Sequence, residues 1–261
     1  WESNFNLSHF KTTITSLNSA TGFYDRINWW MNNWTQRAAI GESPWLFYGY
    51  VEEGIFQSVE ELQNSALPAD NNGEEYAIAE NSIWVGDVKY KDINGDGIIT
   101  GDDQTYIGNP WPKYFAGLTN SLSYKGFDLS ILITSTIGND VYNYLRNENS
   151  NPNNINLGRN MFVSALDYAQ LTTDAEGNTI LANPGTTVAR IASSSKNGNY
   201  SRHTNKYVED GSFVRLKNVT LNYNLPATLL ARQKFIKGAR VGVSAQNVWT
   251  ITGYSGYDPE V

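Results

Sequence analysis

The sequence contains no cysteine. Disulfide bonds, thiol catalysis and cysteine-based zinc sites are therefore excluded within this chain. Histidine is also scarce: the two residues are His9 and His203, and neither lies in a recognisable Ser/His/Asp motif or beside a G-x-S-x-G turn. The sequence gives no support for hydrolytic catalysis, and we expect that the chain is not an enzyme.

Basic charge and long apolar runs are lacking as well. The chain has 19 Lys and Arg against 26 Asp and Glu, for a formal net charge of -7. Nucleic-acid binding needs a clustered basic face, so we expect no nucleic-acid partner. No stretch approaches the ~20 apolar residues of a membrane helix. Membrane strands stay open as an alternative, because their alternating residues are hidden in hydropathy averages.

Aromatic residues are abundant, with 8 Trp, 16 Tyr and 10 Phe. Several stretches alternate between apolar and polar residues, as strands with two different faces do. The clearest pair is 114–124 and 127–134, joined by Lys125-Gly126. Glycine supplies the positive φ of a tight hairpin turn. We therefore predict an antiparallel hairpin over this region.

The predicted strands lie near residues 1–17, 112–124, 127–137, 212–225 and 239–250. Short links alternate with two very long ones, 18–111 and 138–211, and loops longer than ~15 residues are uncommon in compact soluble domains. Membrane barrels place short turns on one side and long loops on the other. Patterning alone leaves a soluble antiparallel sheet with one wet face open, while the loop lengths favour the barrel.

The long loops carry signals of short helices. Ser58 and Glu61 have the spacing of a helix-capping box, and 160–169 has apolar residues on one helical face. Segments rich in Asn, Gly and Ser near 147–156 and 193–199 are typical of mobile loop tips.

Three tryptophans crowd the first long loop. Trp29, Trp30 and Trp34 could stack on sugar rings or anchor a partner protein. The alternative is that they pack the loop onto itself. Both interpretations stay open, and we retain the three residues as candidate ligand or partner contacts.

A calcium-type loop is the sharpest local motif. Residues 92–103 have the pattern D-x-N-x-D-G-x-I-x-x-x-D. Calcium prefers six to eight oxygen ligands, which this spacing gathers around one point. The predicted ligands are Asp92, Asn94, Asp96, the Ile98 carbonyl and Asp103. Asp at the last position is shorter than the usual Glu and resembles a dockerin-type loop. The alternative is a turn held by its own Asx hydrogen bonds.

Several motifs together resemble the SusC/RagA family of TonB-dependent outer-membrane transporters. Their order and spacing match the last third of that family, and the match covers most of the chain except 18–40 and 145–205. The motifs lie at 43–57 (S-P-W-L-F-Y-G-Y and E-G-I-F-Q), 86–97 (G-D-V-K-Y-K-D-I-N-G-D-G), 107–113 (I-G-N-P-W-P-K), 120–128 (N-S-L-S-Y-K-G-F-D), 138–142 (G-N-D-V-Y), 207–221 (Y-V-E-D-G-S-F-V-R-L-K-N-V-T-L), 243–248 (V-S-A-Q-N-V) and 252–260 (T-G-Y-S-G-Y-D-P-E).

The resemblance implies an all-β chain: the C-terminal segment of a large antiparallel transmembrane β-barrel, with long extracellular loops containing short helices. Residues 1–261 would form one partial barrel domain, with the plug domain and the final strand outside this chain. Family membership further implies the outer membrane of a Gram-negative bacterium, a SusD-like surface lipoprotein as partner, the TonB complex acting through the N-terminal part, and a glycan or oligopeptide substrate. The loop at 92–103 maps to an outer loop, where we expect calcium to be structural.

The competing hypothesis is a secreted glycan-binding β module with a dockerin-like calcium loop. The two hypotheses differ in the environment of the apolar strand face. A transporter wall would present Leu118, Leu122, Leu129, Ile131, Leu221 and Val243 as one belt facing lipid. A binding module would bury the same residues in a closed core.

Overall fold

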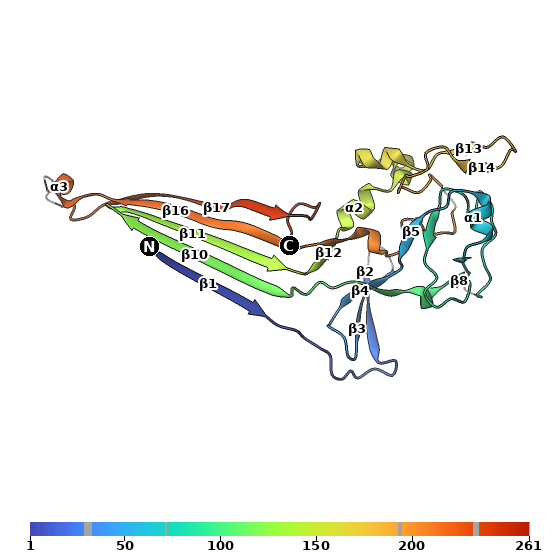
Figure 1. Ribbon diagram of the computed structural model, residues 1–261, viewed down its shortest axis with the longest axis horizontal. Coiled ribbons are helices and arrows are strands. Elements are labelled where there is room, and N and C mark those ends of the chain that lie inside the picture. Colours follow the sequence, from blue (N-terminus) through green and yellow to red (C-terminus); the bar gives the residue numbers. More distant parts are fainter. Residues whose placement is uncertain (29–32, 71, 193–194, 232–234, 261) are drawn as a thin grey trace. The chain divides into compact units, whose positions relative to one another are not determined.

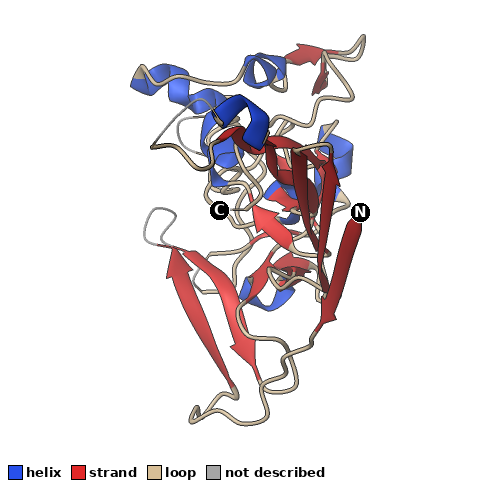
Figure 2. Ribbon diagram, turned by 90° about the vertical axis from the view of Figure 1, so that its left-hand side faces the viewer, coloured by secondary structure: helices blue, strands red, loops and turns tan. Residues whose placement is uncertain are grey.

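A computed structural model describes residues 1–28, 33–70, 72–192, 195–231 and 235–260, with backbone alone at 27–28 and 33–35. Strands predominate and the helices are short (Figure 2). Among the described residues, no helix is both long and apolar enough to cross a membrane. The chain divides into two compact units. Unit 1 comprises Trp1–Thr12, Trp111–Val141 and Asp210–Val261, and unit 2 comprises Thr13–Pro110 and Tyr142–Glu209.

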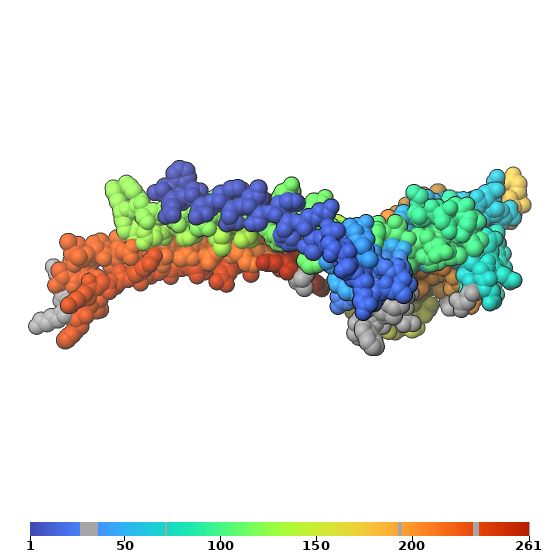
Figure 3. All heavy atoms as spheres, turned by 90° about the horizontal axis from the view of Figure 1, so that it is seen from below, coloured from blue at the N-terminus to red at the C-terminus, as the bar shows by residue number. Residues whose placement is uncertain are grey.

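Unit 1 is an antiparallel five-stranded sheet with the order β1-β10-β11-β16-β17 (Figure 1). Its outermost strands are β1 and β17, and Figure 3 shows β1 in dark blue along its edge. The one helix described in this unit, α3 (Ala227–Leu230), follows β16. The strands are β1 (Glu2–His9), β10 (Tyr114–Tyr124), β11 (Phe127–Ile137), β16 (Phe213–Asn224) and β17 (Arg240–Thr252).

Local sequence explains where these strands turn and stop. Strands β10 and β11 pair up to Tyr124 and Phe127, which leaves a two-residue loop. Lys125 and Gly126 have φ values of +46° and +87°, as a type I′ hairpin turn requires, so the hairpin prediction is confirmed. Pro226 follows the end of β16 and lacks the N–H that a ladder needs. Strand β1 ends at His9, whereas the sequence predicted a strand to residue 17.

The two segments predicted as long loops make up most of unit 2, which has its own secondary structure. A four-stranded sheet has the order β2-β3-β4-β9, and three further pairs are β5 with β7, β6 with β8 and β13 with β14. These strands are β2 (Phe23–Asn28), β3 (Asn33–Ala39), β4 (Leu46–Gly49), β5 (Glu52–Ile55), β6 (Leu67–Pro68), β7 (Val88–Tyr90), β8 (Ile98–Ile99), β9 (Thr105–Gly108), β13 (Leu171–Thr173) and β14 (Thr179–Leu181).

The helices of unit 2 are one or two turns long. Helix α1 (Val59–Gln63) begins at Ser58, whose hydroxyl accepts from the Glu61 N–H, so the predicted N-cap is confirmed. The others are α2 (Tyr144–Asn149) and the 3-10 helices η1 (Gly101–Asp103), η2 (Pro152–Leu157), η3 (Val163–Asp167) and η4 (Asn205–Tyr207). Strands β12 (Asp140–Tyr142) and β15 (Val208–Asp210) form a further two-stranded sheet.

The hydrophobic core lies in unit 2. Its most buried members include Phe56, Leu62, Ile83, Val85 and Ile99. The described residues of the Asn-rich segments that were predicted as mobile loop tips pack into the same unit. Residues 147–156 contribute to α2 and η2, and Asn147, Asn154, Asn197 and Asn199 are buried. Asparagine favours turns in isolation, but here its amide groups also bond to backbone elsewhere in the unit.

Candidate functional site

One face of the unit 1 sheet is apolar across all five strands. Cross-strand partners share a face because side chains alternate along each strand. One row of partners passes from β1 to β17 through Phe5, Leu118, Ile133, Leu216 and Trp249. A second passes from β10 to β17 through Leu122, Leu129, Leu221 and Val243. Phe5 and Trp249 are each 64% exposed and Val243 is 68% exposed. The face is therefore open and mainly hydrophobic, with two polar residues, Ser3 and Asn120, in the row between these two.

A bulge in β16 keeps the apolar residues of this strand on one face of the sheet. Strand β16 has apolar residues at even positions first, Val214 and Leu216, and then at odd positions, Val219 and Leu221. The register shifts between β11 and β16 at this point, and Lys217 is the extra residue. An extra residue reverses the side-chain alternation beyond it. As a result, both halves of the strand direct their apolar residues to one side.

The other face of the sheet is polar and carries a buried arginine. Arg215 is 3% exposed, and its guanidinium forms ion pairs with Asp258 and Glu260, each at 2.5 Å. Lys217 reaches the same Glu260 carboxylate at 2.7 Å. The segment after β17 is thus fastened to the polar face by two cations. We call this arrangement, Arg215 and Lys217 with Asp258 and Glu260, the terminal ion-pair cluster.

The cluster borders a cavity of about 530 Å³ on the same unit. Its lining includes Asn6, Thr134, Thr136, Phe213 and Pro259. No sequence pattern indicated this site, although Arg215 and Glu260 both lie in motifs that carry the family resemblance. Their separation in sequence, 215 against 260, gave no sign that they meet.

The predicted calcium loop folds around its own hydrogen bonds. Both carboxylate oxygens of Asp92 accept from backbone N–H groups, of Gly95 at 2.7 Å and Gly97 at 2.9 Å. Asp96 accepts from Ile98 N–H at 3.0 Å, and the fully buried Asp103 accepts from Ile93 and Thr100. These bonds are those of the Asx-turn alternative.

The oxygen ligands of the loop are of the type that calcium prefers. Within the described ranges, however, no group of three or more His, Cys, Asp or Glu side chains could hold a metal ion. A calcium ion would therefore depend on the Asn94 amide oxygen and the Ile98 carbonyl as well as on carboxylates. The predicted ligand set stays a prediction.

The aromatic prediction concerned the first long loop. Trp29 and Trp30 lie outside the described residues, and Trp34 lies in β3 with its side chain outside the description. Nearby on the same sheet, the Arg37 guanidinium lies over the rings of Phe23 and Tyr48, at 3.9 and 3.7 Å from their centroids. Its partner is Asp25, at 2.6 Å, and these bonds raise the pKa of Arg37. This stacked ion pair holds β2, β3 and β4 together.

One buried ion pair anchors part of the polar interior of unit 2. Asp87 is fully buried and accepts from Arg190 at 2.8 and 3.1 Å. The Asn199 amide donates to Asp87 at 2.8 Å and its oxygen accepts from the Val88 N–H at 3.0 Å. Breaking such a pair would leave an uncompensated buried charge. Since Asn199 bonds both to Asp87 and to Val88 of β7, the network holds the segment 195–202 against β7.

His203 is buried without a hydrogen-bond partner. It is 2% exposed, and in the described part of the chain neither ring nitrogen has a partner. The Tyr142 ring lies 4.2 Å away and the Phe47 ring 6.4 Å away, centroid to centroid. Burial in this apolar site lowers the pKa of His203 to about 4, because a charged imidazolium would lose its hydration.

Comparison with known proteins gives consistent matches over the whole chain. The chain is 30% identical over 271 residues to TonB-dependent receptor P3 of Formosa agariphila, covering 100% of this chain and 23% of that protein. It is 25% identical over 270 residues to TonB-dependent receptor SusC of Bacteroides thetaiotaomicron, covering 100% and 22%. The chain therefore spans about a quarter of the length of these relatives. No family model matches it.

Solved structures give the same fold. "Structure of the RagAB peptide transporter" superimposes with a TM-score of 0.64 at 22% identity, covering 99% of this chain and 24% of that chain. The RagAB peptide importer in its "open-open" state gives a TM-score of 0.60 at 21% identity. The strands, the two-faced sheet and these neighbours define an all-β chain with the fold of a segment of a barrel transporter. The chain belongs to the SusC/RagA family of TonB-dependent receptors.

Proposed function

We propose that this chain forms part of the membrane wall and the extracellular loops of a TonB-dependent transporter in the outer membrane of a Gram-negative bacterium. The observation that carries the proposal is the sheet of unit 1, with one mainly apolar face and one mainly polar face. In a bilayer, every backbone group must be bonded within the sheet while apolar side chains face lipid.

Strand length supports this assignment. Strands β10 and β11 have 11 residues each, β16 has 12 and β17 has 13. A tilted membrane strand needs ~9–11 residues. Strands β10 and β11 join through two residues, whereas the chain between β11 and β16 contributes to unit 2. Short turns on one side and long segments on the other are typical of outer-membrane barrels.

The secreted binding module is the weaker candidate because the apolar face is not enclosed. None of the six diagnostic residues, which include Leu129, Ile131 and Val243, belongs to the buried core cluster of unit 2. A soluble protein rarely leaves a contiguous apolar surface of this extent exposed. Lipid would cover it in the transporter.

Substrate and partners follow from the same proposal. Two of the structural neighbours are described as a peptide transporter and a peptide importer, and we propose import of oligopeptides or glycans rather than a catalytic role. Energy would come through the TonB complex, which would engage the N-terminal part of the whole protein.

We propose that a SusD-like lipoprotein contacts the helical segment of unit 2. Large apolar side chains are exposed along η2 and η3: Leu157 is 63% exposed, Val163 83% and Leu166 60%. Exposed apolar residues of this kind mark protein interfaces when they are grouped. Structural calcium in loop 92–103 belongs to the proposal as well, in support of the loop conformation.

Single-cysteine labelling tests the membrane assignment directly: this chain has no cysteine of its own, and any cysteine elsewhere in the receptor would be replaced with serine. Cysteine would be placed at positions 129 to 133 of β11 in the full receptor, spin-labelled, and reconstituted in lipid vesicles. We expect high oxygen accessibility and low accessibility to a water-soluble nickel reagent at Leu129, Ile131 and Ile133. The reverse is expected at Ser130. Equal accessibility of both faces to the nickel reagent would refute the proposal.

A further inference from the structure

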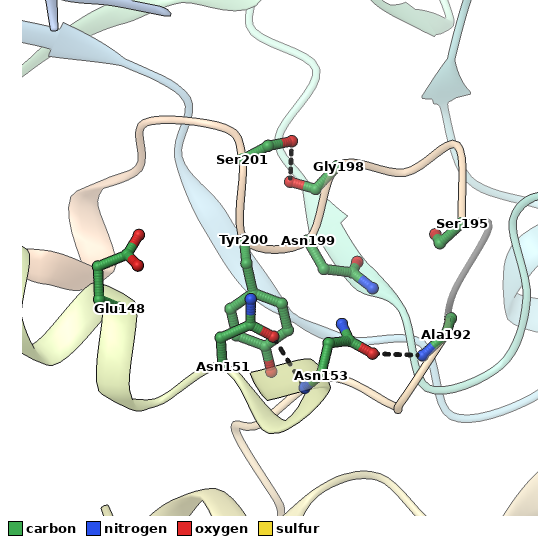
Figure 4. A pocket seen from close by; sticks show the side chains of 9 residues that line it. All are labelled: Glu148, Asn151, Asn153, Ala192, Ser195, Gly198, Asn199, Tyr200 and Ser201. Carbon is green, nitrogen blue, oxygen red and sulfur yellow. Dashed lines mark hydrogen bonds between the residues drawn. The ribbon is translucent and has the colours of Figure 1, made fainter. Parts of the chain in front are cut away.

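A polar pocket of about 310 Å³ lies in unit 2 (Figure 4). Two parts of the chain form it: one runs from α2 into η2, and the other consists of Ala192 and residues within 195–201. Ligand pockets have volumes of ~300–1,000 Å³, so this one fits a single small ring rather than an oligomer. Its lining is Glu148, Asn151, Asn153, Ala192, Ser195, Gly198, Asn199, Tyr200 and Ser201.

Hydrogen bonds fix the orientation of two lining amides. The Asn151 side-chain oxygen accepts from the Asn153 N–H at 3.0 Å, and the Asn153 side-chain oxygen accepts from the Ala192 N–H at 2.9 Å. Because both oxygens are engaged, each Nδ2 must point the other way. Figure 4 shows both nitrogens directed to the same side. Among the described residues neither nitrogen has a partner, so the pocket presents two free donors.

A carboxylate and an aromatic ring complete the lining. Glu148 lies across from the two amides (Figure 4). Burial, and then the Glu148 carboxylate, raise the pKa of Tyr144 to about 12, as expected next to an anion. The Tyr200 ring lies behind the amides, and its hydroxyl donates to the Ala189 carbonyl at 3.2 Å. The ring is therefore held in place as an apolar surface.

These groups favour a neutral sugar. A hexose offers hydroxyl oxygens to the amide donors, hydroxyl protons to Glu148 and a C–H surface to an aromatic ring. Among the described residues that line the pocket there is no Lys or Arg, so a carboxylate or sulfate on the ligand would meet Glu148 without a cation in that lining to compensate. We infer that this pocket binds one neutral hexose unit of a glycan and rejects acidic sugars. The inference concerns sugar binding by unit 2. It rests on the proposed function in one respect only, namely that unit 2 is exposed to the extracellular medium.

The rigidity of the pocket supports a preformed site. Asn199 bonds to both Asp87 and Val88, and the Arg202 guanidinium donates to the Asn197 carbonyl at 3.0 Å. A ligand would therefore meet donors that are already placed, which lowers the ordering cost of binding.

The test is calorimetric titration of the detergent-solubilised full receptor with neutral trisaccharides of glucose, galactose, mannose or xylose, and with trigalacturonate. We expect at least one neutral trisaccharide to bind and trigalacturonate not to bind. Asn153→Asp keeps the oxygen that accepts from Ala192 but removes the free donor, so affinity should fall about tenfold, as for loss of a hydrogen bond next to a charge. Asn160→Asp is the matched control, since Asn160 is exposed and lies outside the lining.

Glu148→Gln supplies a gain of binding that a folding defect cannot imitate. Removing the negative charge should allow trigalacturonate to bind while neutral sugars bind more weakly. The inference is overturned if no neutral trisaccharide binds, if trigalacturonate binds the parent equally well, or if the Asn153 and Asn160 variants behave alike. Transport is not measured, so these outcomes leave the membrane assignment to its own experiment.

Discussion

The Arg215 guanidinium and the Glu260 carboxylate lie 2.5 Å apart on the polar face of the sheet, although 45 residues separate them in sequence. Arg215 is nearly fully buried, whereas Asp258 and Glu260 each keep 42% of their side chains exposed. The cation is thus built into the sheet, and the carboxylates belong to the segment that it holds.

The first prediction is that removing both carboxylates frees the segment after β17. In the double variant Asp258→Asn, Glu260→Gln, the backbone amides at 253–260 should exchange with solvent about tenfold faster. The buried Arg215 guanidinium holds this segment on the sheet only while its two partners carry a negative charge. Hydrogen exchange read by mass spectrometry measures this. Arg240→Gln is the control, since the exposed Arg240–Asp128 contact at 3.4 Å should contribute little. Unchanged exchange in the double variant would remove the cluster as a fastening.

The same cluster predicts an acid response. Hydrogen bonding from Arg215 holds the pKa of Asp258 below its ordinary value. A depressed carboxyl pKa stabilises the folded form above the unfolded pKa near ~3.9, and this contribution is lost as the pH falls further. Exchange at 253–260 should therefore stay constant from pH 7 to about pH 4 after correction for the intrinsic rate. A steep rise already at pH 6 would contradict this cause.

The second prediction separates the two faces of β11. Ile131→Arg should destabilise the folded protein in lipid by ~2–4 kcal/mol, because arginine at the middle of the lipid face loses its hydration. Ser130→Arg, one residue away on the polar face, should cost about 1 kcal/mol or less. Urea unfolding in lipid vesicles measures both. Equal costs would show that the two faces share one environment.

The third prediction concerns His203. Its folded pKa of about 4 lies below the ordinary value near ~6.5, so folding keeps the ring neutral. Stability is complete above about pH 6.5 and is lost as the pH falls toward 4, by about 3 kcal/mol at full titration. Thermal unfolding of unit 2 against pH should show this loss.

Substitution identifies the group responsible for that loss. His203→Phe suits the surrounding rings of Phe47 and Tyr142 and should flatten the profile between pH 6.5 and 4. His9→Phe, at the other histidine of the chain, should leave the profile as in the parent. Acid sensitivity that survives in His203→Phe would assign the response to other groups.

The fourth prediction tests calcium in loop 92–103. Replacing Asp92 and Asp96 with Asn should reduce the protection that calcium gives residues 86–106 against protease, since two anionic ligands become neutral. Asp102→Asn is the control, because Asp102 is exposed and outside the predicted ligand set. Equal cleavage of the parent protein with calcium and with chelator would leave only the Asx turn.

Much of the sheet was predictable because its signals are local. Alternation along 114–124 and 127–137 and the Lys125-Gly126 turn act over a few residues, and the structure has the hairpin there. The bulge was not predictable in the same way. Lys217 is the extra residue of the bulge only because of how β16 pairs with β11 and β17. The alternating pattern before Lys217 and the one after it each match these neighbouring strands, but they are out of step with one another in sequence.

The candidate sites divide along the same line. Sequence alone determined the two-faced strands, the calcium-type spacing at 92–103 and the family, since each depends on residue type at short separation. Tertiary structure alone decided that Arg215 meets Glu260, that His203 lies buried without a partner, and that Asn151 and Asn153 line a pocket. Asparagine-rich segments favour turns in isolation, whereas buried donors and acceptors from distant residues gave these ones fixed positions.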